Sequence, residues 1–175
     1  MFWVLAISYW IHLLATIVWL GGIIVMIFIA WPALQQGSLE TNQWLNLQRR
    51  FLPWINASLV ILLITGFYQM TSDPNYTGFL SVDSTWAWAI LLKHIAYGAM
   101  VIITLVVQVY LYPAMSRLSL LAEKHPDLAA AEREKLQQQE IRLLRINLVC
   151  AVTVLLFTAV ALSLIHISEP TRPRR

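Results

Sequence analysis

The sequence has little charge and almost no cysteine. Only 12% of its 175 residues are charged, while 59% are hydrophobic. A soluble globular protein of this composition would have too few polar residues to cover its surface. The single cysteine, Cys150, excludes a disulfide framework or a cysteine metal cluster within the chain. The formal charge of +3 is not gathered on one soluble face, so no nucleic-acid partner is expected. These shortages indicate an integral membrane protein whose main partner is the lipid bilayer.

Long hydrophobic runs dominate what is present. Four of them, at about residues 3–31, 51–70, 86–112 and 146–166, can each cross a hydrocarbon core of about 30 Å, which needs roughly 20 helical residues. The first run lacks the basic start and small-residue cleavage site of a signal peptide, so we expect it in the mature protein. The sequence therefore predicts one all-α domain over residues 1–166, an integral membrane four-helix bundle.

Basic residues are distributed unevenly over the three loops. The first loop carries Arg49 and Arg50, the third carries six basic and five acidic residues between Arg117 and Arg145, and the second, 71–85, has no Lys or Arg. By the positive-inside rule, loops one and three are cytoplasmic and both termini lie outside a bacterial inner membrane. The third loop is rich in strong helix formers, which predicts a helical cytoplasmic extension between the third and fourth membrane helices.

Local signals predict the helix limits around the first loop. Thr41-Asn42 can cap a short interfacial helix that brings Trp44 to the headgroup level. The second span is expected to begin near Phe51, with Pro53 in its first turn. Tyr112 and Pro113 are expected to close the third span.

The last 13 residues of the sequence have an origin different from the rest, by our interpretation. The stretch SLIHISEPTRPRR, residues 163–175, resembles the peptide encoded when sequencing-adapter DNA is read as coding sequence. We therefore interpret it as a non-native tail and exclude His166 and the terminal arginines from functional reasoning.

Two histidines within the spans are the candidate site. His12 lies nine residues beyond Trp3 and His94 eight beyond Trp86, so each is about 12–14 Å from the outer interface. An ionisable side chain within a span is costly and marks a functional site by default. Two imidazoles at one depth can be the axial ligands of a b-type haem. Each could instead hydrogen-bond a polar side chain on a neighbouring helix.

Two residues near His94 complete the predicted cofactor site. Gly98, one turn later, could provide room for a haem. Lys93 could neutralise a propionate or a negative intermediate, or it could snorkel to the outer headgroups. The predicted metal ligands are His12 and His94, and the predicted cofactor-binding residues are these two with Lys93 and Gly98.

Methionine thioethers offer a different metal chemistry because they are soft donors that suit Cu(I). Four methionines lie in or near the spans: Met26, Met70, Met100 and Met115. They are scattered along the chain with no close pair, which favours apolar packing.

Several segments resemble a known family. The run from His12 to Gly22, HLLATIVWLGG, followed by Pro32, resembles the CopD-type copper-resistance membrane domain. The same resemblance continues through Arg50-Phe51, the stretch from Ser58 to Gly66, and Leu91-Leu92-Lys93. It implies copper resistance or uptake, often with a periplasmic copper-binding partner.

The chain is also similar, more distantly, to the HemJ-like four-helix protoporphyrinogen oxidases. That similarity rests on the first-span His12 and the third-span Lys93 and implies b-type haem. The chain has Ala30-Trp31-Pro32-Ala33 where that group has an arginine-containing, tyrosine-rich end of span one. An enzymatic activity is therefore left open.

Three functions remain at this stage. The first is a haem b protein that transfers electrons, alone, as a homo-oligomer or as a subunit of a membrane redox complex. The second is a copper transport or copper resistance protein of CopD type. The third is a structural membrane subunit without a cofactor.

Overall fold

The computed structural model is an all-helical bundle, and it describes residues 2–73, 76, 78, 85–121 and 126–168. No strand occurs in these residues. Backbone groups in lipid must find hydrogen-bond partners within their own segment, which explains why every apolar run is helical. The elements are α1 (Phe2–Val25), η1 (Met26–Ala30), α2 (Trp31–Gln35), α3 (Thr41–Thr71), α4 (Thr85–Val106), η2 (Val107–Leu111), α5 (Tyr112–Leu121) and α6 (Pro126–Ser168).

These elements join into four long helical rods. Each rod is long and apolar enough to cross a membrane, which confirms the predicted all-α membrane bundle. The first rod is α1–η1–α2, the second is α3, the third is α4–η2–α5 and the fourth is α6. The fourth rod and α5 also form the predicted helical extension between the third and fourth spans. Of the tail, residues 169–175 lie outside the described residues.

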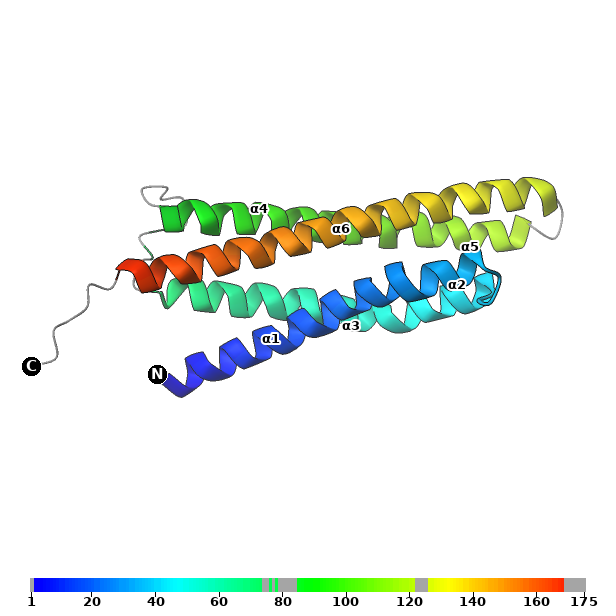
Figure 1. Ribbon diagram of the computed structural model, residues 1–175. Helices are drawn as coiled ribbons and strands as arrows, with labels where there is room; N and C mark the ends of the chain where they lie inside the picture. Colours follow the sequence, from blue (N-terminus) through cyan, green and yellow to red (C-terminus); the bar gives the residue numbers. More distant parts are fainter. Residues whose placement is uncertain (1, 74–75, 77, 79–84, 122–125, 169–175) are drawn as a thin grey trace, which may run out of the picture.

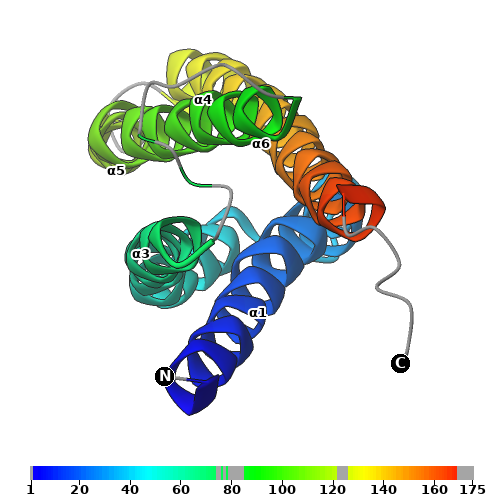
Figure 2. The same ribbon diagram turned by 90° about the vertical axis from the view of Figure 1, so that its left-hand side faces the viewer.

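The rods form two pairs. The first packs along α3, and the third packs along α6 (Figure 1). Seen along the bundle, the two pairs lie side by side, and α6 also contacts α1 (Figure 2). A core of apolar side chains centred on α1, η1 and α3 joins the pairs. The start of α1 and the end of α6 lie at the same end of the bundle as the end of α3 and the start of α4 (Figure 1).

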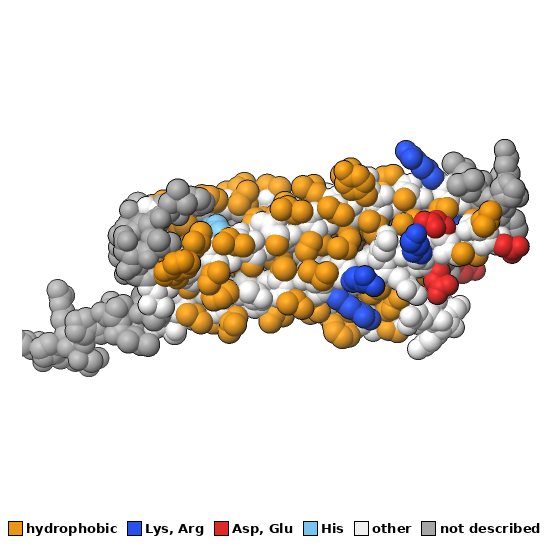
Figure 3. Space-filling model, turned by 90° about the horizontal axis from the view of Figure 1, so that it is seen from above, with side chains coloured by type: hydrophobic (Ala, Val, Ile, Leu, Met, Phe, Trp, Pro, Cys, Tyr) orange, Lys and Arg blue, Asp and Glu red, His pale blue; other side chains and the backbone are white. Residues whose placement is uncertain are grey.

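The outer surface has the polarity of a membrane protein. Hydrophobic side chains cover most of the face in Figure 3, whereas Lys, Arg, Asp and Glu side chains gather toward the end that contains α5 and the beginning of α6. Large apolar residues such as Phe28, Trp54 and Leu156 are exposed on the rods. A surface of this kind is suited to lipid rather than water.

Two prolines lie within continuous rods, Pro32 and Pro113, although Pro113 was expected to close the third span. Each follows a π-helical turn, in the pairs Trp31-Pro32 and Tyr112-Pro113. The backbone N–H of the aromatic residue donates to a carbonyl five residues back, Met26 for the first and Val107 for the second. A proline ring normally clashes with the carbonyl four residues before it, and the wider π turn shifts that carbonyl. The helices therefore continue toward the loops.

Helix α3 begins ten residues before the predicted second span. Glu40 and Gln43 form a capping box, so the helix begins at Thr41 and Pro53 lies inside it rather than in its first turn. No separate interfacial helix is formed. Trp44 is fully buried, with 0% of its surface exposed, instead of lying at the headgroup level.

A buried carboxylate explains the position of Trp44. Glu140 of α6 is also 0% exposed. It accepts hydrogen bonds from Trp44 Nε1, at 3.3 Å, and from Gln48 Nε2. Trp31 packs edge-on against Trp44 with ring centroids 6.2 Å apart. This polar contact joins α3 to α6 at the end of the bundle opposite the first residues of α1.

Candidate functional site

A cavity of about 350 Å³ lies between the two helical pairs. It is lined by residues from α1, α3, α4 and α6, and it opens in the half of the bundle where α1 and α4 begin. Most of the lining is apolar. The polar side chains that matter below are His12, Thr16, Lys93, His94, Tyr97 and Thr158.

The imidazole of His12 is held by α3. Its Nδ1 lies 2.7 Å from Thr65 Oγ1, and that hydroxyl lies 2.6 Å from the carbonyl oxygen of Ile61. A hydroxyl has one proton to donate, and a carbonyl can only accept, so Thr65 donates to Ile61 and accepts from His12. The proton of the neutral ring is therefore on Nδ1. Nε2 then carries the lone pair that a metal ion could use.

The imidazole of His94 is fixed in the same tautomer by its own helix. Nδ1 lies 2.7 Å from the carbonyl oxygen of Ile90, which can only accept, so Nδ1 carries the proton. The ring also packs edge-on against Phe67 of α3, with centroids 5.8 Å apart. A backbone carbonyl that orients an imidazole in this way is a common second-shell partner of metal-bound histidine.

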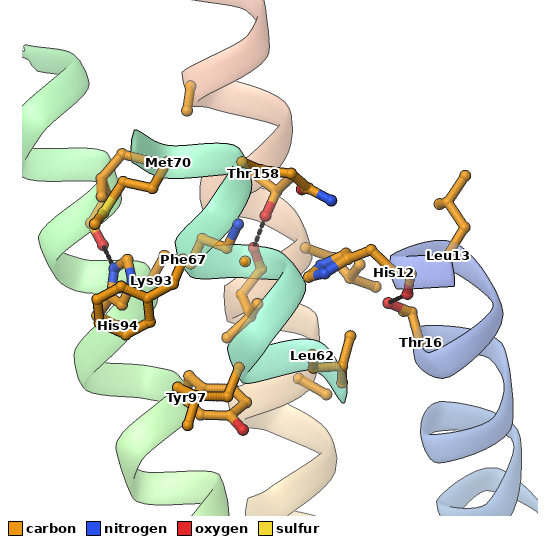
Figure 4. A pocket seen from close by; sticks show the side chains of 18 of the residues that line it. His12, Leu13, Thr16, Leu62, Phe67, Met70, Lys93, His94, Tyr97 and Thr158 are labelled. Atoms are coloured by element: carbon orange, nitrogen blue, oxygen red, sulfur yellow. Dashed lines mark hydrogen bonds between the residues drawn. The ribbon is translucent and has the colours of Figure 1, made fainter. Parts of the chain in front are cut away.

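The two histidines lie at a similar depth. Their contacts on α3, Thr65 and Phe67, are two residues apart, which is about 3 Å along a helix. Figure 4 shows His12 on α1 and His94 on α4 on the two sides of the pocket. Both line the cavity. Their contacts lie on different faces of α3. That the two histidines hold one haem is still a prediction.

The other two predicted site residues differ in position. Lys93 lines the cavity and is half-buried. Gly98 does not belong to the cavity lining, and a methyl group added there would have no atom within 4 Å outside its own neighbourhood. Gly66 is the glycine closest to the site, because an added methyl group would lie 3.7 Å from His12 Cε1.

Two methionines that are far apart in the sequence line the same cavity, although they belong to separate apolar clusters. Met70 of α3 and Met100 of α4 both line the cavity and are buried. Met26 and Met115 are equally buried but lie elsewhere. The sequence carried no signal that both line one cavity, since the two residues are on different helices and the cavity depends on how α3 and α4 are placed.

The donor set is unusual for a metal site. The described residues contain no group of three or more His, Cys, Asp or Glu side chains that could hold a metal ion. The cavity lining offers imidazole nitrogen from His12 and His94 and thioether sulfur from Met70 and Met100, beside the carboxylate of Asp73. The imidazole and thioether donors suit a soft ion and not a hard one such as Mg²⁺ or Ca²⁺.

The fold and this cavity define a class: a multi-pass membrane protein with imidazole and thioether donors at one intramembrane site. The family model of Copper resistance protein D matches residues 45–161, about two thirds of the chain. The chain belongs to that family. No curated protein and no solved structure matches the chain.

Proposed function

We propose that the protein binds copper as Cu(I) in this cavity and handles it within a bacterial inner membrane. The observation that supports the proposal is that Met70 and Met100 line the same cavity as His12 and His94. Thioether and imidazole donors together favour Cu(I) among the biological metals. The membrane fold and the family are consistent with a role in copper resistance.

Each histidine has a defined part in this proposal. Thr65 and the Ile90 carbonyl hold the two rings with Nε2 as the donor atom. Second-shell partners of this kind orient the ligand and raise its basicity. The sulfur atoms contribute soft, polarisable contacts without adding charge.

Lys93 would help to select the ion. Its ammonium group lines the same cavity and repels any cation there. Coulomb repulsion grows in proportion to the charge of the ion, so it opposes Zn²⁺ or Cu²⁺ about twice as strongly as Cu(I). Repulsion by Lys93 therefore opposes a monovalent ion less than a divalent one.

The proposed orientation places the cavity in the outer half of the membrane. The basic residues of loops one and three define the cytoplasmic side by the positive-inside rule. The cavity lies in the opposite half, near the starts of α1 and α4. Copper would then enter from the outside of the cell.

A Cu(I) competition assay tests the proposal. Purified protein in detergent is titrated against a chromophoric Cu(I) chelator under reducing, anaerobic conditions. We expect one bound Cu(I) per chain. The double variant Met70→Leu/Met100→Leu should lower the affinity at least about tenfold, since thioether donors are lost while volume is nearly conserved.

The chain offers a matched control for that variant. Met26→Leu/Met115→Leu makes the same chemical change at two buried methionines outside the cavity. It should leave the Cu(I) affinity unchanged. An equal loss in both double variants, or no Cu(I) binding by the unaltered protein, would refute the proposal.

Haem b is the second candidate, and the size of the cavity favours it. A volume of about 350 Å³ could hold on the order of ten water molecules, far more than one ion needs. His12 and His94 would hold the haem iron through Nε2, and Lys93 would pair with a propionate. Bound haem would supply one-electron redox chemistry. Reduced-minus-oxidised absorption bands of a low-spin b haem in the purified protein would select this function over copper.

A further inference from the structure

The indole of Trp19 is an anomaly in the cavity wall. Its side chain is 2% exposed and lines the cavity. Nε1 is buried and has no hydrogen-bond partner among the described residues. An unsatisfied buried donor costs about 1–3 kcal/mol, so such groups usually meet an acceptor when the site is filled.

Lys93 is a second donor in the same cavity, and Asp73 is a carboxylate of the same lining. By contrast, three hydroxyls of the cavity are already committed to backbone carbonyls. Thr16 donates to His12, Tyr97 to Leu59 and Thr158 to Val154.

The two donors lie at different depths. Lys93 adjoins His94, which lies at a depth similar to that of His12. Trp19 follows His12 by seven residues, which is about 10 Å along α1. Between these levels the wall is largely apolar, with side chains such as Leu20, Leu62 and Met100.

We propose that the cavity binds an elongated, largely apolar carboxylic acid. Its carboxylate pairs with the Lys93 ammonium, and a second oxygen about 10 Å away accepts the hydrogen bond of Trp19 Nε1. Neither donor could serve copper, because neither an ammonium group nor an indole N–H has a lone pair to give. The inference therefore stands independently of the proposed copper function.

Competition photolabelling tests it. Copper-free protein is placed in phosphatidylcholine nanodiscs with a chelator and labelled with a hexadecanoic acid that carries a diazirine in its chain. The competitors are hexadecanoic acid, its methyl ester and 10-oxohexadecanoic acid. The ketone of 10-oxohexadecanoic acid lies nine bonds from its carboxyl carbon. In an extended acyl chain this spacing corresponds to the offset of about 10 Å between the levels of Lys93 and Trp19.

The expected result is a graded competition. The oxo acid should compete about fivefold better than hexadecanoic acid, and the methyl ester at least about tenfold worse. Lys93→Met should abolish the preference for acid over ester. Trp19→Phe should abolish the preference for the oxo acid and leave the preference for acid over ester intact.

Trp10→Phe is the matched control, since Trp10 is an exposed tryptophan of α1 outside the cavity. It should preserve both preferences. Equal competition by acid and ester in the unaltered protein would overturn the proposal, and so would preferences that survive both cavity variants. Either failure would leave the Cu(I) assay unaffected, because the labelling is done without copper.

Discussion

Replacing Glu140 by leucine should strongly destabilise the fold. The carboxylate is fully buried and accepts from two buried side chains, Trp44 and Gln48. Leucine would leave both donors unsatisfied, at about 1–3 kcal/mol each, so we expect the free energy of unfolding to fall by about 2–6 kcal/mol. Adding Gln48→Leu to Glu140→Leu removes one of those donors and should recover about 1–3 kcal/mol.

The free energies are measured by titrating the protein in mixed micelles with SDS and following helix content by circular dichroism. Glu134→Leu is the control, because Glu134 is an exposed carboxylate on the same helix. It should change stability by less than about 0.5 kcal/mol. The reasoning would be refuted if Glu140→Leu were as stable as the control, or if Gln48→Leu deepened the loss instead of reducing it.

Three further experiments give simpler tests. Thr65→Val removes the hydroxyl that accepts from His12, and it should weaken Cu(I) binding about tenfold in the competition assay. Thr158→Val, at another threonine of the cavity, is the control and should not weaken it. Gly98→Ala should leave metal binding unchanged and stabilise α4 by about 0.5–1 kcal/mol in SDS titration, since the added methyl group finds open space; a loss of binding would place Gly98 in the site. In a variant without Cys150, an impermeant maleimide added outside intact cells should label Ser72→Cys but not Arg117→Cys. The reverse pattern would invert the proposed orientation.

The membrane fold was predictable because it depends on local properties of the chain. Hydrophobic runs of sufficient length specify helices in lipid whatever their neighbours are. The helix ends were less predictable. Pro113 suggested a stop, yet the π turn before it allows the rod to continue.

The site was predictable only in part for a physical reason. His12, Lys93 and His94 stand out because ionisable residues are rare in spans, and all three line the cavity. Met70 and Trp19 look like ordinary apolar residues in a sequence. Their role depends on which side of each helix faces the cavity, and on whether a buried indole N–H finds a partner, and neither can be read from spacing along one chain.

Glu140 shows the same limit from the other direction. In the sequence it belongs to a charged, helix-forming segment that suggests a solvated face. In the structure it turns toward α3, where Trp44 and Gln48 satisfy it. Gln48 and Trp44 precede Glu140 by 92 and 96 residues, and contacts over such separations have no local signature in the sequence.

X-ray absorption at the copper edge tests the central claim most directly. Protein loaded with one Cu(I) should show both sulfur and nitrogen neighbours, from the thioethers of Met70 and Met100 and the imidazoles of His12 and His94. The sulfur signal should disappear in Met70→Leu/Met100→Leu and persist in Met26→Leu/Met115→Leu. A copper shell without sulfur in the unaltered protein, or one that keeps its sulfur when the two cavity methionines are replaced, would contradict the account.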